Sequence, residues 1–252
     1  MKMLEKIVQF LDAELKIADF EDSSNNGLQV ENSGDVKKIC CGVDASLEMF
    51  VESSRRGADM VITHHGISWG DSLKRISGLN YRRIEYLIKN NMALYSCHLP
   101  LDAHPVYGNN AQICKALGLK ALKPFGEYHG REIGFAGKLP KAMTYASFKK
   151  KVAKVTCSEL QTMDFGKKRV KTVAVVSGGA AGEIDEAGRK GIDVYVSGEP
   201  ALSAYNLAKE HGINGIFAGH YATEVFGVKA LAALLNRKFN VKAEFVDFGI
   251  EY

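Results

Sequence analysis

Short apolar runs alternate with stretches of helical periodicity along most of the chain. The runs 38–43 and 60–63 are mostly apolar, as expected of strands buried on both faces, and the stretch 47–56 between them repeats apolar positions at helical spacing. A similar series resumes at the apolar run 173–176. Strands that alternate with helices in this way form parallel or mixed sheets covered by helices. The pattern therefore predicts an α/β fold.

The same periodicities set the expected elements. Helices are expected over 1–17, 47–56, 81–89, 110–117, 145–155, 183–189, 201–210 and 225–235. Strands are expected over 38–43, 60–63, 93–97, 159–165, 173–176, 194–196, 215–218 and 242–248, with a strand or hairpin over 128–139. The segment 23–30 is typical of a polar turn that leads into a strand.

The rhythm of strands and helices breaks near Pro124-Phe125-Gly126 and resumes at the apolar run 173–176. We therefore expect two similar α/β lobes with mixed sheets flanked by helices. The larger, discontinuous lobe would comprise 1–125 and 191–252 and would bind metal, and the smaller lobe would comprise 126–190. A loose echo between the halves is compatible with two similar lobes, since Gly57-Ala58-Asp59 and Gly191-Ile192-Asp193 each precede a strand. Ligand sites commonly lie between such lobes.

Composition narrows the function classes. No apolar run approaches the length of a membrane span, and the amino end is charged throughout, unlike a secretory leader. A net charge of +4 does not call for a nucleic-acid partner. None of the 5 cysteines forms a C-x-x-C pair, which argues against zinc fingers and zinc nucleobase deaminases. We expect reduced thiols and a cytoplasmic protein.

Two adjacent histidines, His64 and His65, follow the apolar run 60–63 and precede Gly66. Imidazole is a common ligand of divalent transition metals. Neighbouring side chains of a strand point to opposite faces. Both rings can therefore serve one site only where the strand breaks, and Gly66 permits such a break. Otherwise the two rings serve two neighbouring ions. For this pair alone, a hydrogen-bonded histidine without metal is an equal alternative.

Two further loops at strand ends carry histidines and carboxylates. The first reads His98-Leu99-Pro100-Leu101-Asp102-Ala103-His104-Pro105. Its Asp102 is a candidate metal ligand, its His98 a ligand, general base or partner of a ligand, and its His104 a site residue or a turn residue. In the second loop, His220 and Glu224 are four residues apart and share one helix face. A carboxylate at that position is also favoured by the helix dipole alone.

The run Ser177-Gly178-Gly179-Ala180-Ala181-Gly182 follows a strand and precedes a helix. Its spacing matches neither G-x-G-x-x-G nor a P-loop. We interpret it as a tight turn, with phosphate binding by its backbone amides as the alternative. Arg131 and Lys168 are further candidates for holding phosphate. Glu199 ends a strand and is either a site residue or a carboxylate at a helix start.

Together the three loops offer three imidazoles and two carboxylates, from His64, His65, Asp102, His220 and Glu224. This set exceeds the four ligands of one closed tetrahedral zinc site. It suits two ions roughly 3.5–4 Å apart, with a bridging carboxylate and open positions for water. Mixed nitrogen and oxygen ligation is compatible with zinc, manganese, iron or nickel. We therefore predict two divalent metal ions per chain, held by loops at strand ends.

Six segments of the sequence resemble one known family. They are Ser24-Asn25-Asn26-Gly27-Leu28-Gln29-Val30, Ile62-Thr63-His64-His65-Gly66, His98-Leu99-Pro100-Leu101-Asp102-Ala103-His104-Pro105, Gly108-Asn109-Asn110-Ala111, Ser197-Gly198-Glu199 and Gly219-His220-Tyr221-Ala222-Thr223-Glu224. They resemble the NGG-one-interacting-factor-three-like family, in its short bacterial and archaeal branch. Its members are often labelled GTP cyclohydrolase 1 type 2 homologues. The likeness runs nearly end to end.

The resemblance implies two α/β lobes, a dinuclear metal site facing an internal cavity, and a toroidal homohexamer. By motif position, the ligands fall on His64, His65, Asp102, His220 and Glu224, with Glu224 as the bridge. Tyr221 stands where some relatives have a second histidine. The long insertion of some bacterial members is absent.

We thus expect a metal-dependent hydrolase in which two ions activate a water molecule. His98 is the first candidate for the proton-shuttling group and His104 the second. The resemblance implies a GTP-like nucleotide as substrate, while a phosphoester would suit the same centre. The alternative is a non-enzymatic metal-handling or adaptor protein. A ring that threads nucleic acid is disfavoured by the modest charge.

Overall fold

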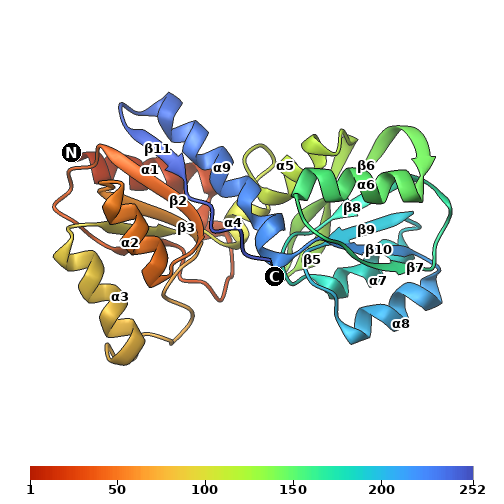
Figure 1. The fold of residues 1–252 in the computed structure, drawn as a ribbon, viewed down its shortest axis with the longest axis horizontal. Coiled ribbons are helices and arrows are strands. Elements are labelled where there is room, and N and C mark those ends of the chain that lie inside the picture. The colour runs from red at the N-terminus through yellow and green to blue at the C-terminus, as the bar shows by residue number, and fades with distance from the viewer. Residues whose placement is uncertain (252) are drawn as a thin grey trace. The chain divides into compact units, whose positions relative to one another are not determined.

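The computed structural model describes residues 1–251 and shows an α/β protein with two mixed sheets flanked by helices, as the sequence predicts (Figure 1). The chain forms two compact units. The first unit comprises Met1–Leu101 and Gly227–Phe248, and the second comprises Asp102–Phe226 with the residues from Gly249 onward. These bounds differ from the expected lobes, 1–125 with 191–252 and 126–190, because several strands outside 126–190 hydrogen bond into the second sheet.

The first unit is built on a five-stranded sheet of order β1-β4-β3-β2-β11. Only β1 runs antiparallel to its neighbour, and the other pairs are parallel. The strands are β1 (Gly27–Val30), β2 (Lys38–Asp44), β3 (Met60–His65), β4 (Ala93–Ser96) and β11 (Lys242–Phe245). The helices are α1 (Met3–Leu15), η1 (Ile17–Asp19), α2 (Leu47–Arg55), α3 (Gly78–Lys89) and the later part of α9 (His220–Lys238). The short helix α4 (Leu99–Asp102) follows β4.

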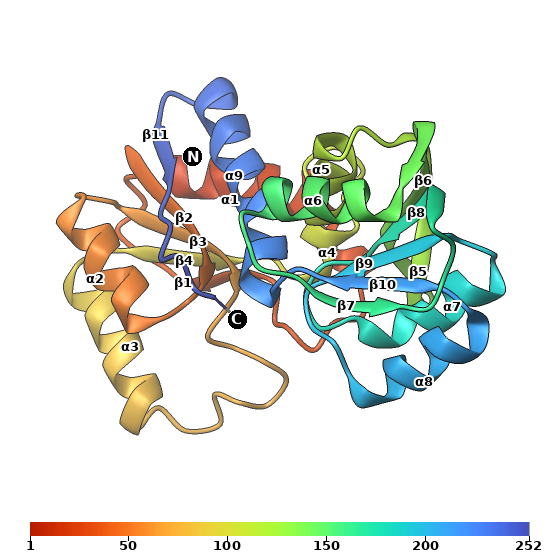
Figure 2. The same cartoon turned by 45° about the vertical axis from the view of Figure 1, so that its right-hand side comes forward.

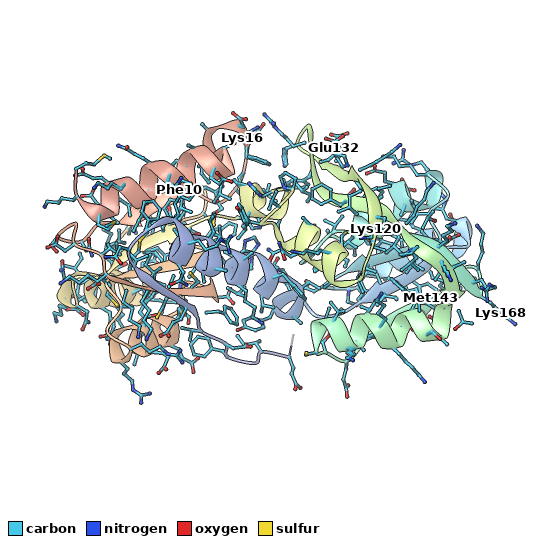
Figure 3. All side chains as sticks on the ribbon, turned by 90° about the horizontal axis from the view of Figure 1, so that it is seen from above. Phe10, Lys16, Lys120, Glu132, Met143 and Lys168 are labelled. Atoms are coloured by element: carbon cyan, nitrogen blue, oxygen red, sulfur yellow. The ribbon has the colours of Figure 1, made fainter. Side chains whose placement is uncertain are left out.

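Both faces of the first sheet are buried, which explains its nearly continuous apolar strands. The register pairs Cys40 with Val61 and Val61 with Leu94, so these side chains share one face. They form a core with residues of α2 and α3, which lie together in Figure 1. Tyr95 points to the opposite face and donates a hydrogen bond to Asp12 of α1 (2.8 Å). Figure 3 labels Phe10 of α1, whose ring packs edge-on against Phe239, just after α9 (5.4 Å).

The second unit is built on a six-stranded sheet of order β5-β6-β8-β9-β10-β7. Strands β8, β9 and β10 are parallel, and the remaining pairs are antiparallel. The strands are β5 (Lys120–Tyr128), β6 (Arg131–Thr144), β7 (Gln161–Asp164), β8 (Arg169–Val175), β9 (Val194–Ser197) and β10 (Asn214–Phe217). The helices are α5 (Asn109–Ala116), α6 (Tyr145–Thr156), η2 (Ala181–Glu183), α7 (Ile184–Arg189), α8 (Leu202–His211) and the start of α9.

Helices cover both faces of the second sheet as well. Phe148 and Val152 of α6 and Ile113 of α5 form a core with strand residues such as Val173 and Val194. Helices α7 and α8 lie on the other face, which the second view shows clearly (Figure 2). Among the described residues, no helix is both long and apolar enough to cross a bilayer.

The two units repeat one series of elements. The order strand-helix-strand-helix-strand occurs as β2-α2-β3-α3-β4 and as β8-α7-β9-α8-β10. The echo in the sequence has a structural basis. Asp59 accepts hydrogen bonds from two successive backbone amides at the start of β2 (2.8 and 3.0 Å), and Asp193 accepts two from amides of β8 (both 2.9 Å). Each carboxylate thus ties a crossover connection to the strand that precedes it.

Candidate metal centre

In the first unit, the candidate residues gather at the carboxyl ends of three parallel strands. His64 and His65 end β3, and His98 follows β4. Asp44, which the sequence analysis did not single out, ends β2 at the position paired with His65. This edge is where open α/β sheets bind ligands. Parallel pairing in register therefore brings together side chains that lie far apart in the sequence.

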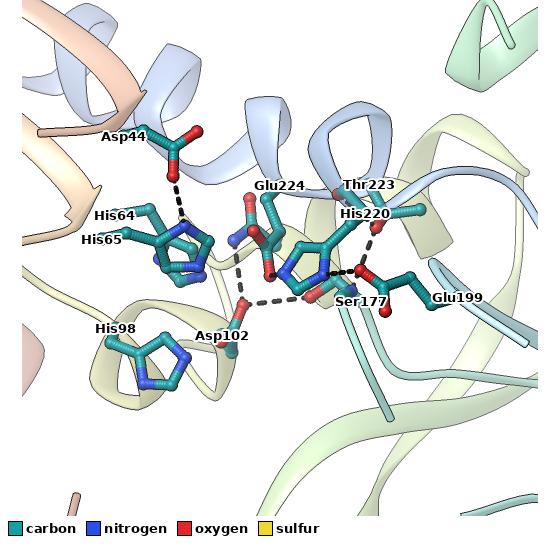
Figure 4. A network of polar contacts seen from close by, with 12 residues as sticks. Asp44, His64, His65, His98, Asp102, Ser177, Glu199, His220, Thr223 and Glu224 are labelled. Carbon is teal, nitrogen blue, oxygen red and sulfur yellow. Dashed lines mark hydrogen bonds and ion pairs between the residues drawn. The ribbon is translucent and has the colours of Figure 1, made fainter. Parts of the chain in front are cut away.

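His64, His65 and His98 form a compact group, which we call the histidine group (Figure 4). Their ring centroids are 4.8 Å (His64–His65), 5.2 Å (His64–His98) and 5.6 Å (His65–His98) apart. One ring nitrogen of each lies within 4.8 Å of the others, a spacing at which the three can hold a metal ion. His64 and His65 both belong to β3, so the strand does not break between them. Their rings nevertheless come together.

Each ring of the histidine group uses its Nδ1 atom for a hydrogen bond to an oxygen of the protein. The acceptors are the Cys97 carbonyl for His64 (2.9 Å), the Asp44 carboxylate for His65 (2.8 Å) and the Asp22 carboxylate for His98 (2.9 Å). These oxygens can only accept, so Nδ1 carries the proton. In the neutral ring, Nε2 then holds the lone pair that a metal requires. This arrangement is typical of metal-binding histidines.

Asp22 was not among the residues that the sequence singled out. Its side chain is only 2% exposed, and besides His98 it accepts hydrogen bonds from the amides of Ser24 (3.0 Å) and Leu99 (3.1 Å) and from Asn26 (2.8 Å). Burial alone would raise the pKa of this carboxyl group. The hydrogen bonds and the neighbouring imidazole outweigh burial and lower the pKa to about 2. Asp22 is therefore a fixed anion behind His98.

The polar segment 23–30, predicted as a turn into a strand, also orders the loops around the histidine group. Asn26 accepts a hydrogen bond from the His98 amide (2.7 Å). Asn25 donates to the Ser68 hydroxyl (2.7 Å) in the segment that follows β3, and Gln29 accepts from the Ile67 amide (2.9 Å). The segment thus joins the loop after β3 to the loop after β4.

In the second unit, the candidate residues again follow parallel strands. Ser177 comes after β8, Glu199 after β9 and His220 after β10. The His220 ring lies between two carboxylates: Nδ1 contacts Glu199, and Nε2 lies 3.1 Å from Glu224 (Figure 4). Burial would lower the pKa of His220, but Glu224 and then Glu199 outweigh it and raise the pKa to about 9. Without metal, a proton occupies this position.

The donor atoms of His220 and Glu224 suit one metal ion. Adjacent ligands at about 2.0–2.2 Å from a divalent ion lie roughly 2.8–3.6 Å apart in octahedral or tetrahedral coordination. The separation between His220 Nε2 and Glu224 Oε1 is 3.1 Å. The i,i+4 spacing predicted from the sequence therefore gives a candidate ligand pair at the first turn of α9.

The glycine run contacts this ligand pair, which its interpretation as a tight turn did not anticipate. A Cβ atom on Gly178 would lie 2.3 Å from Glu224 Oε1 and 3.2 Å from His220 Nε2. Gly178 also has a φ of +67°, in the left-handed region that favours glycine. In contrast, a Cβ atom on Gly182 would meet nothing within 4 Å. Glycine at 178 thus leaves room for the two donor atoms.

Asp102 is buried (5% exposed) and lies in the second unit. Its Oδ1 atom accepts hydrogen bonds from the Ser177 hydroxyl (3.0 Å) and from Asn109 (2.9 Å). These bonds orient the carboxylate. His104 has a different setting: its Nδ1 accepts from the amides of Val106 (3.2 Å) and Tyr107 (3.0 Å), so this nitrogen stabilises a turn.

The two basic candidates lie at other places in the second unit. Lys168 is exposed and precedes β8, at the end of that strand opposite to Ser177 (labelled in Figure 3). Ser177 lies nine positions after Lys168, at the far end of a mostly extended segment of about 30 Å. Arg131 starts β6 and is paired with Tyr128 in the β5–β6 hairpin. We therefore assign neither residue to the carboxyl edge of this sheet.

The chain is similar to known proteins along nearly its whole length. The chain matches the family model described as Duf34/NIF3 (NGG1p interacting factor 3) over residues 2–249. The chain belongs to the Duf34/NIF3 family. Among curated members, it is 44% identical to a protein of Archaeoglobus fulgidus named GTP cyclohydrolase 1 type 2 homolog, over 97% of each chain. It is 43% identical to a protein of the same name from Pyrococcus horikoshii, covering 96% of this chain and 97% of the other.

Solved structures of Duf34/NIF3-like proteins share the fold. The protein TTHA1606 from Thermus thermophilus aligns with a TM-score of 0.89 and 37% identity, over 98% of this chain and 99% of its own. The protein ybgI, described as of unknown function, aligns with a TM-score of 0.93 and 34% identity over the whole of both chains. The family membership and the fold predicted from the sequence are thus confirmed.

Proposed function

We propose that this protein is a metal-dependent hydrolase. The name of its relatives, GTP cyclohydrolase 1 type 2 homolog, suggests an activity of the same kind. Two divalent ions would be held by the ligands that the family resemblance implies: His64, His65, Asp102, His220 and Glu224. Zinc, manganese, iron and nickel all accept such nitrogen and oxygen ligands. The substrate would be a nucleotide or another phosphoester.

The observation that carries this proposal is the common hydrogen bonding of the histidines. His65, His98 and His220 each direct Nδ1 toward a carboxylate, and His64 directs Nδ1 toward a carbonyl. Such partners fix the ring orientation and make Nε2 a better ligand. Four histidines with this arrangement, all at strand ends, support metal ligation.

Divalent ions bound here would lower the pKa of a water molecule and supply hydroxide near neutral pH. The protein's own groups would do the rest. His98, backed by the fixed anion Asp22, can accept a proton at Nε2 and return it to a leaving group. Its Nδ1–H is held by the carboxylate throughout, which keeps the ring in the tautomer needed for this role. His104 is the weaker candidate, because one of its nitrogens accepts amide hydrogen bonds.

The test is hydrolysis by variants that keep their fold. We expect His64→Ala and Glu224→Ala to reduce turnover of nucleotides or phosphoesters to background, with unchanged circular dichroism spectra. His211→Ala is a matched control, since His211 also pairs with a carboxylate, Asp185 (2.8 Å), but lies at the end of α8. Loss of metal in the two variants, with no turnover of any substrate class by the wild type, would instead favour a metal-handling or adaptor protein.

The family resemblance also leads us to propose a ring-shaped homohexamer in the cytoplasm. Light scattering coupled to size-exclusion chromatography tests the assembly. A mass of about six chains is expected under the proposal, and a stable monomer would contradict it.

A further inference from the structure

Trp69 is the single tryptophan of the chain, and it lies beside the histidine group. Its ring centroid is 5.1 Å from that of His98, with the two planes at 71°, and 5.8 Å from that of His65. The side chain is half-buried, in the segment that follows β3. A large aromatic surface thus adjoins two of the three imidazoles of the first unit.

The position of the Trp69 ring is fixed on several sides. Its Nε1–H donates to the Gly66 carbonyl (2.9 Å), and its backbone amide donates to the Ser72 hydroxyl (2.8 Å). An isolated β-bridge pairs Ser24 with Trp69. Asn25 holds the same segment through the Gly70 carbonyl (3.0 Å). Because the indole N–H is already bonded to the protein, the ring offers a ligand its aromatic surface.

A fixed aromatic surface of this kind recognises flat, ring-containing molecules. Bases stack on aromatic side chains with little dependence on sequence. A phosphoester without a ring gains nothing from such a surface. The two substrate classes left open above therefore differ in what Trp69 can do for them.

We propose that Trp69 is a specificity-determining residue, whose ring stacks on the planar heteroaromatic base of a nucleotide substrate beside the histidine group. This inference rests on the proposed hydrolase function and narrows its substrate class to nucleotides. The ring positions the base, and the chemistry stays with the metal ligands and His98.

The test compares ligands that share phosphates and differ in the base. Metal-loaded wild type would be titrated with GTP, ATP, CTP and UTP, and with inorganic tripolyphosphate as the ring-free control. Calorimetry gives the affinities, and the emission of the single tryptophan, corrected for nucleotide absorbance, reports events at Trp69. We expect at least one nucleotide to bind more tightly than tripolyphosphate and to quench the emission saturably.

Two variants separate stacking from packing. Trp69→Leu keeps apolar bulk without a π face and should weaken binding of that nucleotide by about 5- to 150-fold, leaving tripolyphosphate affinity unchanged. Trp69→Phe keeps an aromatic face but loses the bond to Gly66, and should retain most of the affinity. Should Trp69→Leu fail to fold, the emission titration of the wild type and the calorimetric affinities of Trp69→Phe decide the question. In turnover, the leucine variant should raise KM with little effect on kcat.

The proposal is overturned if no nucleotide binds better than tripolyphosphate, or if Trp69→Leu binds nucleotide as the wild type does. Failure of the proposed function gives a different result. Hydrolysis of glycerol phosphate that is lost in Glu224→Ala, without base-dependent binding, would sustain the hydrolase and refute the role of Trp69. Base-dependent binding that Trp69→Leu weakens, with no turnover of any substrate, would sustain the role of Trp69 in binding and refute the hydrolase.

Discussion

Replacing Asp22 with asparagine removes the charge behind His98 at nearly constant side-chain size. In the wild type, this carboxylate is almost fully buried and its pKa is lowered from 3.8 to about 2. That lowering is equivalent to about 2.5 kcal/mol of stabilisation of the folded protein. We therefore expect metal-free Asp22→Asn to unfold with a free energy about 2 kcal/mol below that of the wild type at neutral pH.

The dependence on pH follows from the direction of the shift. Because the folded-state pKa lies below the ordinary value, the stabilisation is fully present above about pH 4 and is lost as the pH falls toward 2. The difference between wild type and Asp22→Asn should be constant near neutrality and shrink over that range. Urea unfolding of the metal-free proteins, followed by circular dichroism at several pH values, measures it.

Asp71→Asn provides a matched control, since it makes the same change of charge at a side chain that is 82% exposed and pairs with Lys74 at the surface. The control should change stability little. In metal-loaded protein, Asp22→Asn should also lower turnover, because it removes the carboxylate that keeps His98 in the tautomer needed for proton transfer; initial rates measure this. Equal stabilities of the two variants, or a difference that persists undiminished to pH 2, would refute the reasoning.

Three other predictions concern the second unit. Gly178→Ala should destabilise the protein by about 1–2 kcal/mol, because alanine is strained in a left-handed backbone, and it should reduce metal content. Gly182→Ala should do neither. If thermal melts and metal analysis do not distinguish the two variants, the close approach of Gly178 to Glu224 is refuted. In metal-free protein, His220 should titrate near pH 9, and its stabilising effect should be lost as the pH rises from about 6.5 through 9; an NMR midpoint near 6.5 would contradict this. Asp193→Asn should cost about 1–3 kcal/mol in urea unfolding, and an unchanged midpoint would count against its role in the crossover.

The pattern of the sequence was sufficient to locate most of the elements that position the site. Strands β2, β3 and β4 are buried on both faces, so their apolar runs are nearly continuous and end where the polar residues begin. His65 and His98 stand at those ends. Because parallel strands bring their carboxyl ends to one edge, position along the chain was enough to predict where these side chains lie.

Other features depend on contacts that no local pattern contains. Asp22 and His98 are 76 residues apart in the chain, and only tertiary structure brings them together. Strand β5 begins at Lys120, well before the expected hairpin at 128–139. The sequence pattern missed its first residues, because they are exposed at the sheet edge and show no apolar alternation. Helix α9 begins at His220 and not at residue 225. The sequence pattern missed its first turn, because that turn carries the polar candidates His220 and Glu224 instead of a regular apolar stripe.

The role of the glycine run was also not predictable from its spacing. The sequence of this run is compatible with any tight turn. What distinguishes Gly178 is the distance from its backbone to Glu224, which arises from the return of the chain into α9 more than 40 residues later.

The central claim is that the protein holds two metal ions. The most direct test is the metal content of the purified protein by plasma mass spectrometry, on wild type and Glu224→Ala side by side. About two ions per chain in the wild type, lost in the variant, is the result we predict. Little metal in the wild type, even after reloading with zinc, manganese or iron, would contradict the account.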